Sequence, residues 1–270
     1  MLQFGINVSI LLREYPFLER FDQAARLGFG VAEFWWPHGE DLRALVRRVR
    51  DSGLRVALVN FDGGDLAAGE RGVLNDPARL PAFRAHVPAA LELAAQLGCP
   101  RMNALAGRWH TDAPHDEQLA QLREQYAWLA AQAHEAGVAV QIEPLNSWDN
   151  GPCVFTRSRE TLEFIESVGA PNLQLQYDIY HMQRMEGNIA ATVRELAGRI
   201  GHMQFADSPG RNQPGTGELR FGYLFEAIAA SGYTGVISAE YNPLGDSAAS
   251  LGWLPPDRRG PIAPSALKSL

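Results

Sequence analysis

Short runs of apolar and β-branched residues alternate along this chain with longer segments whose apolar residues recur at three- and four-residue spacing. Each longer segment is followed by a glycine and then by a short apolar run, an order that recurs at Gly28, Gly53, Gly98, Gly137, Gly169, Gly198 and Gly232. Glycine is favoured just past the last turn of a helix because that position adopts a positive φ. The pattern therefore predicts helices and strands in alternation.

Eight strands are predicted, at 4–9, 31–36, 55–61, 101–106, 139–145, 173–180, 200–206 and 236–241. Helices are predicted between them, among others at 17–27, 42–49, 81–97, 119–135, 161–168 and 224–230. Strands that alternate with helices of this length form parallel βαβ units. We therefore expect a single-domain (β/α)8 TIM barrel over residues 1–253, followed by a Pro-rich tail over 254–270. The alternative is an open doubly wound sheet, but the Gly-rich turn that it needs after its first strand is missing from Asn7-Val8-Ser9-Ile10-Leu11.

Length and charge agree with a barrel enzyme that acts on small molecules. The chain has 270 residues, which is enough for a TIM barrel of about 250 residues. Its net charge is -7. The acidic balance argues against a nucleic-acid partner. Cys99 and Cys153 lack metal-like spacing and suggest a reducing compartment. With no signal-peptide pattern and no long apolar run, we expect a cytoplasmic protein without a membrane partner, and a homo-oligomer remains open.

The distribution of basic residues excludes one large class of barrel enzyme. The chain contains one lysine, Lys268 in the Pro-rich tail, and its other basic residues of this class are arginines. Schiff-base chemistry requires a buried lysine. A lysine-dependent aldolase is therefore not expected.

Polar residues interrupt the predicted strands near their carboxyl ends. In a TIM barrel these ends meet at one face, where active sites lie, so residues distant in sequence converge there. Asn60, Glu33 and Asn103 are more easily explained by structural roles, and His202 by a second layer of the barrel. His181 is expected to be functional. The full set is Glu33, Asn60, Asn103, Glu143, Asp178, His181, His202, Gln204, Asp207 and Glu240.

Four of these residues end consecutive strands and offer oxygen ligands: Glu143, Asp178, Gln204 and Glu240. Such donors suit Mg²⁺ or Mn²⁺, and three clustered carboxylates would repel one another without a cation. Glutamates on opposite sides of a substrate are also placed to remove and return a proton. A single strand-end carboxylate could equally cap a helix or pair with arginine, but four on consecutive strands favour a site.

Two loops are predicted to cover the site. The first, at 207–218, is rich in turn-forming residues and follows the seventh strand. It contains Arg211, which could hold an oxyanion through two hydrogen bonds, and ends at Glu218, a further candidate for substrate binding. The second loop, at 64–72, contains Arg71 as another anion clamp, although both arginines could equally be solvated. Trp35, Trp36 and Trp109 are candidates for pocket walls, although at least one of the first two is expected to be an ordinary core residue.

At these residues the sequence resembles the hydroxypyruvate isomerases of the xylose-isomerase-like barrel superfamily. The motifs that carry the resemblance occur in order over almost the whole chain up to Trp253. They are Asn7-Val8-Ser9, 16–21, 64–72, Ile142-Glu143-Pro144-Leu145-Asn146, Gln176-Tyr177-Asp178-Ile179-Tyr180-His181, His202-Met203-Gln204, Pro214-Gly215-Thr216-Gly217-Glu218 and Ala239-Glu240-Tyr241.

The resemblance implies roles for the strand-end residues. Glu143 and Glu240 would be the acid/base pair, and together with Asp178 and Gln204 they would surround a metal position. His181 and Arg211 match positions that touch substrate in the related ketose 3-epimerases. Those epimerases have histidine as the third metal ligand where this chain has Gln204, so the metal would be bound weakly or be dispensable. Hydroxypyruvate isomerases share this glutamine.

The implied reaction is a 1,2-hydrogen shift through an enediolate that interconverts hydroxypyruvate and tartronate semialdehyde, with a sugar acid as the substrate class. A 2-oxotetronate isomerase is the nearest alternative, since its motifs are nearly the same. A ketose 3-epimerase is disfavoured by Gln204, and an endonuclease acting on abasic DNA by the acidic charge. A non-catalytic sugar-acid binding protein is disfavoured because Glu143 and Glu240 are both present.

Overall fold

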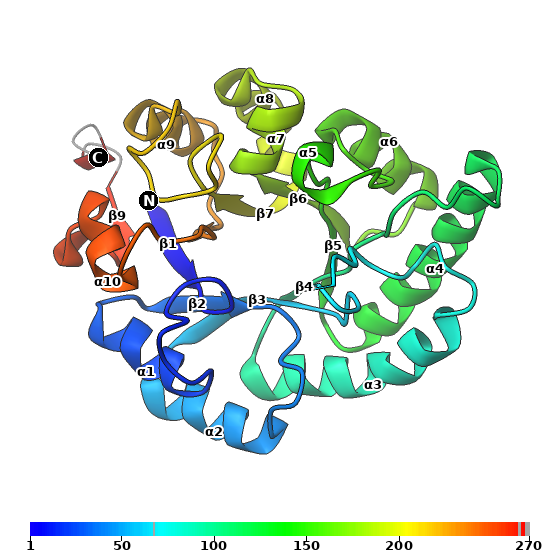
Figure 1. Ribbon diagram of the computed structural model, residues 1–270, viewed down its shortest axis with the longest axis horizontal. Coiled ribbons are helices and arrows are strands. Elements are labelled where there is room, and N and C mark those ends of the chain that lie inside the picture. Colours follow the sequence, from blue (N-terminus) through cyan, green and yellow to red (C-terminus); the bar gives the residue numbers. More distant parts are fainter. Residues whose placement is uncertain (67, 264–265, 268–270) are drawn as a thin grey trace.

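The computed structural model describes residues 1–66, 68–263 and 266–267, and within them eight parallel strands close into a barrel (Figure 1). Closure is made by β1, which pairs with β2 on one side, Ile6 beside Ala32, and with β8 on the other, Phe4 beside Ile237. The prediction of a (β/α)8 barrel is confirmed. The strands are β1 (Leu2–Asn7), β2 (Val31–Phe34), β3 (Arg55–Asn60), β4 (Arg101–Asn103), β5 (Ala139–Ile142), β6 (Leu173–Asp178), β7 (Ile200–Phe205) and β8 (Val236–Ala239).

Helices form a ring around these strands (Figure 1). Six of the seven glycines taken as helix ends have a positive φ, and Gly198 does not. In α2, for example, Asp41 caps the first turn, Leu45 and Val49 are buried, and Gly53 ends the helix with φ 73°. The ring contains α1 (Glu19–Arg26), α2 (Leu42–Ser52), α3 (Leu80–Leu97), α4 (His115–Glu135), α6 (Ser158–Val168), α8 (Ile189–Leu196) and α9 (Phe221–Ala230).

All eight barrel strands end before their predicted carboxyl ends. Pairing stops at Ile142 in β5 and at Ala239 in β8, whereas the sequence pattern continued to 145 and 241. The apolar runs continue past the last ladder hydrogen bond because the following residues still pack over the barrel mouth. Short helices begin soon after β5 and β6, namely α5 (Ser147–Asn150) and α7 (Ile179–Met185). Glu143 and Glu240 therefore stand just beyond the sheet.

The C-terminal segment occupies the place of an eighth outer helix. The short α10 (Ser247–Ser250) and two 3-10 turns (Leu251–Trp253 and Pro256–Arg258) follow β8, and the chain then returns as β9 (Pro261–Ile262), antiparallel to β1 (Figure 1). The Trp253 ring packs edge-on against Phe4 at 5.7 Å. Arg259 is buried and donates to the carbonyls of Leu27, Leu251 and Leu254. This segment, of which the sequence analysis assigned 254–270 to a Pro-rich tail, closes the shell beside β1, while Lys268 lies outside the described residues.

The inside of the barrel is polar below its mouth. Glu33 on β2 bonds to His202 and Gln204 on β7, and because β2 and β7 are not neighbours these contacts cross the barrel interior. The side chains of this layer are fully or almost fully buried: Asn7, Glu33, Asn103, Gln141, Gln176, His202, Gln204 and Ser238. A buried polar layer, joined in part by hydrogen bonds such as those of Glu33, thus supports the floor of the mouth. Among the described helices, none is long and apolar enough to cross a membrane.

Candidate active site

A cavity of about 540 Å³ opens at the carboxyl ends of the strands. Its walls combine carboxylates with cationic side chains and a few apolar ones. Asp178 and Gln204 do not line it, because they lie one layer deeper, with 0% and 1% of their surface exposed. The lining residues used below are Trp35, Arg71, Glu143, His181, Arg211 and Glu240.

Glu240 is held by three donors from different parts of the barrel. Its Oε1 accepts from Asn7 Nδ2 at 2.9 Å and from Trp35 Nε1 at 2.8 Å, and its Oε2 accepts from Arg211 Nη2 at 2.9 Å. Burial raises the pKa of Glu240, and Arg211 and Trp35 oppose that rise. Among the described carboxylates that line the cavity, Glu240 has the strongest support for its charged form.

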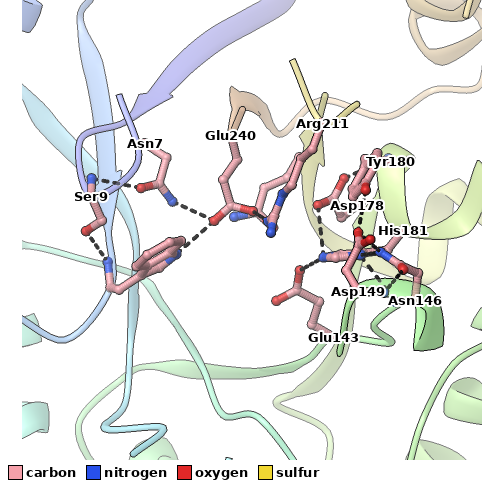
Figure 2. A network of polar contacts seen from close by, with 12 residues as sticks. Asn7, Ser9, Glu143, Asn146, Asp149, Asp178, Tyr180, His181, Arg211 and Glu240 are labelled. Atoms are coloured by element: carbon pink, nitrogen blue, oxygen red, sulfur yellow. Dashed lines mark hydrogen bonds and ion pairs between the residues drawn. The ribbon is translucent and has the colours of Figure 1, made fainter. Parts of the chain in front are cut away.

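Glu143 faces Glu240 from the other side of the cavity (Figure 2). One donor stabilises its charge, Asn103 Nδ2, at 2.7 Å from Oε2. Burial, followed by the charges of Glu240 and Asp178, holds the pKa of Glu143 well above its ordinary value. The two glutamates thus differ in environment, and Glu143 is the more readily protonated. Two carboxyl groups whose pKa values are pushed apart in this way are suited to acid and base roles.

Asp178 is the last residue of β6 and caps α7, where its Oδ1 accepts from the backbone N–H of Tyr180 at 2.8 Å. Its Oδ2 is buried without a hydrogen-bond partner. Burial and the charge of Glu240 raise the pKa of Asp178 to about 7, against the opposing charge of Arg211. An unpaired buried oxygen of this kind indicates that a cation or a proton belongs there.

Among the described residues, Glu143, Asp178 and His181 have ligand atoms within 4.8 Å of one another. The two carboxylates are hard oxygen donors of the type that Mg²⁺ and Mn²⁺ prefer. Glu240 is not part of this group, and its oxygens accept from Arg211, Asn7 and Trp35. Of the four residues predicted to surround a metal, the structure brings Glu143 and Asp178 within reach of one ion.

Gln204 lies beside Asp178 in the sheet, but its side-chain amide is already engaged. Its Nε2 donates to Glu33 Oε1 at 2.6 Å, and its Oε1 accepts from Gln176 Nε2 at 2.6 Å. Burial would raise the pKa of Glu33, but the charge of His202 and the hydrogen bonds from His202 and Gln204 outweigh it and lower that pKa. Gln204 therefore supports an ionised carboxylate beneath the floor in this arrangement.

The loop after β7 is organised by Asp207. Its carboxylate accepts from five backbone N–H groups, those of Ser208, Gly215, Thr216, Gly217 and Leu219, at 2.9–3.1 Å. This loop holds Arg211, whose φ is 55°, against Glu240 and 5.5 Å from the Tyr180 ring centre. Glu218, by contrast, is exposed, bonds to Ser208 Oγ at 3.0 Å and does not line the cavity.

Arg71 lines the cavity, as predicted for an anion clamp. Its Nε donates to Asn150 and its Nη1 to the carbonyl oxygens of Leu66 and Glu70, so one end of the guanidinium is fixed by the protein. Burial and the neighbouring charges of Arg108 and Arg211 lower the pKa of Arg71. Arg71 thus holds a positive charge at the cavity wall, and no carboxylate among the described residues forms an ion pair with it.

Several contact residues were not among the predicted site residues. Asn7 bonds to Glu240, and it ends β1 in the same way that Glu143 follows β5, so the strand-end rule would have found it. Asn146, Asp149 and Tyr180 surround His181, and no sequence spacing points to them. Of the three tryptophans, Trp35 lines the cavity, Trp36 lines the adjoining cleft, and Trp109 stacks on His115 outside both.

The closed barrel with its carboxylates at the mouth agrees with the family to which the chain belongs, the xylose isomerase-like TIM barrel family, whose model it matches over residues 21–256. It is 40% identical to the hydroxypyruvate isomerase of Escherichia coli, over 96% of this chain and 100% of that protein. It is also 40% identical to the 2-oxo-tetronate isomerase of Cupriavidus necator, over 95% of this chain and 98% of that protein. A crystal structure from Brucella melitensis, described as an AP endonuclease of family 2, superimposes with a TM-score of 0.89 at 34% identity, over 94% of this chain and 98% of that one.

Proposed function

We propose that this protein is an isomerase of small hydroxy and oxo acids that interconverts hydroxypyruvate and tartronate semialdehyde. The observation that carries the proposal is the pair of buried glutamates on opposite sides of one cavity, of which Glu240 is paired with Arg211, whereas the pKa of Glu143 is held well above its ordinary value. The relatives named hydroxypyruvate isomerase support the choice of substrate.

In the proposed reaction Glu240 removes a proton from the hydroxymethyl carbon of hydroxypyruvate. The electrons of the broken C–H bond form the carbon–carbon double bond of an enediolate, and the carbonyl π electrons move onto the carbonyl oxygen. Glu143 then delivers a proton to the former carbonyl carbon, while the hydroxyl proton passes from one oxygen to the other. Exchange with solvent resets both carboxyl groups.

The experiment is proton NMR in D2O with hydroxypyruvate, comparing wild type with Glu240→Gln and Glu143→Gln. We expect Glu240→Gln to abolish both turnover and deuterium entry into hydroxypyruvate. Glu143→Gln should abolish turnover yet still allow slow exchange at the hydroxymethyl carbon. The reverse pattern would exchange the two roles, and unchanged turnover in either variant would remove that residue from the mechanism. Glu166→Gln, in an exposed ion pair with Arg199, is the matched control.

A divalent cation would be held by the carboxylates of Glu143 and Asp178, and it would supply positive charge that polarises the substrate oxygens. The unpaired Asp178 Oδ2 supports this proposal. After removal of metal with EDTA, titration calorimetry with Mn²⁺ should show binding to wild type and its loss in Asp178→Asn. Turnover that is unchanged after EDTA treatment would show that the metal is dispensable.

A four-carbon 2-oxotetronate is the second candidate substrate. It is supported by the 2-oxo-tetronate isomerase relative and by the adjoining cleft of about 620 Å³, which shares Trp35, Asn60, Leu66 and Leu105 with the cavity. Comparing kcat/KM for the two acids, for common ketoses and for abasic DNA decides among them. Turnover of ketoses or DNA alone would refute the acid assignment.

A further inference from the structure

We propose that the cavity contains a phosphate subsite, formed by Arg13 and Arg20, that takes the terminal phosphate of a phosphorylated four-carbon oxo acid. The subsite goes beyond the proposed function, and its assignment to an isomerase substrate rests on that function. Its carrying observation is that both arginines line the cavity and that neither forms an ion pair with any described residue.

The lining of the cavity carries more positive than negative charge. Within the described part of the chain, four arginines line it against two glutamates, and one ion pair, between Arg211 and Glu240, joins the two sets. The chain as a whole has a net charge of -7, so the lining differs in sign from the rest of the protein. Such a lining favours a ligand with more than one negative charge. The four arginines are Arg13, Arg20, Arg71 and Arg211.

Arg20 is half-buried, and backbone carbonyl groups fix the plane of its guanidinium. Its Nε donates to the carbonyl oxygen of Tyr15 and its Nη1 to that of Val8, each at 3.0 Å. The centre of the Phe17 ring lies 5.5 Å from the guanidinium carbon. Nη2 has no acceptor among the described residues. A guanidinium whose plane is fixed and whose Nη2 is open is prepared to bind an oxyanion.

The loop between β1 and α1 is fixed by α10 on both sides of Arg13. Before it, the backbone N–H of Leu12 donates to Ser247 Oγ at 2.8 Å. After it, the carboxylate of Glu14 accepts from Ser247 N at 3.2 Å and from Ser247 Oγ at 2.9 Å. Leu12 has a φ of 60°, a conformation that is costly for leucine and is found most often at functional sites. Glu14 is thus turned toward Ser247, and the exposed Arg13 keeps its charge unpaired.

The two arginines lie close enough to affect each other. Burial, followed by the charge of Arg13, lowers the pKa of Arg20, against the opposing charges of Glu14 and Glu40. Like charges of this kind repel, and an anion bound between them would relieve the repulsion.

The subsite and Arg71 lie on opposite sides of the barrel mouth. Arg13 and Arg20 belong to the segment after β1, and Ser9 of the same segment lies on the Glu240 side of the cavity (Figure 2). Arg71 is held by Asn150, which follows β5. Around the barrel, β2, β3 and β4 separate β1 from β5 on one side, and β6, β7 and β8 on the other. An acid bound to Arg71 through its carboxylate would therefore direct its other end toward the subsite.

The chemistry of the subsite fits a phosphate monoester. Such a group carries about -1.5 to -2 charges at neutral pH and presents three acceptor oxygens, which two guanidinium groups can share. On a four-carbon 2-oxo acid, a phosphate at the terminal carbon leaves the carbonyl group and the neighbouring hydroxyl free. The proposed hydrogen shift between these two carbons therefore remains possible with the phosphate in place.

Binding is tested by titration calorimetry in a buffer free of phosphate and sulfate. The probes are inorganic phosphate, erythronate and erythronate 4-phosphate; the two hydroxy acids lack the carbonyl group and cannot be isomerised. We expect wild type to bind the 4-phosphate about tenfold more tightly than erythronate, and Arg13→Gln to lose most of this advantage. Arg20→Gln should lose it too, but it also frees the carbonyls of Val8 and Tyr15, so Arg13→Gln is the decisive variant.

Three results would overturn the proposal. One is equal binding of both hydroxy acids by wild type, and another is an advantage of the 4-phosphate that is unchanged in Arg13→Gln. The third is binding of inorganic phosphate without any advantage for the 4-phosphate, which would assign the subsite to free phosphate. Arg47→Gln is the matched control, because Arg47 is an exposed arginine of α2 that does not line the cavity. It should keep the full advantage.

Kinetics then test the assignment to substrate. We expect kcat/KM for 2-oxotetronate 4-phosphate to exceed that for 2-oxotetronate by about tenfold in wild type and in Arg47→Gln, and the ratio to fall toward one in Arg13→Gln. If both acids are turned over equally well by wild type, the assignment fails while the isomerase function stands. If erythronate 4-phosphate binds through Arg13 but neither oxo acid is turned over, the subsite stands and the proposed function fails.

Discussion

Arg211 Nη2 lies 2.9 Å from Glu240 Oε2, so a cation from the loop after β7 is paired with the carboxylate that follows β8. The same guanidinium opposes the rise in the pKa of Glu143 and of Asp178. One side chain thus offsets part of the repulsion among three carboxyl groups. The predictions below follow from this balance and from the groups that maintain it.

Replacing Arg211 should disable Glu240 as a base. Without the guanidinium the pKa of Glu240 rises further, so less carboxylate is present at a given pH and the acid limb of the kcat/KM profile moves to higher pH. We expect Arg211→Ala to lower kcat/KM by about 100-fold or more, and Arg211→Lys to lower it less. A pH profile that does not move in Arg211→Ala would contradict this account. Arg159→Lys, at an exposed ion pair with Glu195, serves as the control.

Asp207→Ala should loosen the loop that presents Arg211. Five backbone N–H groups lose their shared acceptor, although several belong to exposed residues that water can satisfy. We expect a loss of about 1–2 kcal/mol in the free energy of unfolding and a fall of at least about tenfold in kcat/KM. Asp41→Ala removes a helix cap at α2 and should reduce stability alone. Equal kinetic effects of both changes would argue against a specific role of the loop.

Glu33→Gln should destabilise the protein, since it places an amide among three side chains that donate to the carboxylate, those of Asn7, His202 and Gln204. Breaking such a buried network costs about 3–5 kcal/mol. The folded-state pKa of Glu33 is lowered, so its contribution is present above the unfolded pKa and is lost as pH falls through the folded value. Urea unfolding should therefore show a difference between wild type and variant that shrinks in acid. A difference that stays constant from neutral pH to acid would refute this.

Asp178→Asn should have the opposite effect on stability. The pKa of Asp178 is raised to about 7 in the folded protein, so folding favours its protonated form. That stabilisation is present below the unfolded pKa and is lost as pH rises through the folded value. In EDTA, the variant should be more stable than wild type by roughly 1–3 kcal/mol at pH 8, with a smaller gain at pH 5. Thermal unfolding at both pH values measures this, and a gain that is larger at pH 5 would contradict it.

Much of the fold followed from local patterns. Alternating helix and strand periods, with glycine at the helix ends, predicted all eight barrel strands. The convergence of residues such as Glu143 and Glu240 at one mouth followed from barrel geometry. The sequence did not predict that short segments replace the eighth outer helix, because the segments around α10 and β9 have no strong period and gain their structure from packing on β1.

What the sequence by itself determined is the order of elements and the set of side chains at the barrel mouth, since both depend on spacing along the chain. Only the tertiary structure decided which of these groups form ion pairs or hydrogen bonds with one another. Gln204 bonds to Glu33 across the barrel, Arg211 pairs with Glu240, and Asn146 contacts the ring of His181. Such choices depend on strand register and side-chain rotamers, which bring together residues that are far apart in the chain.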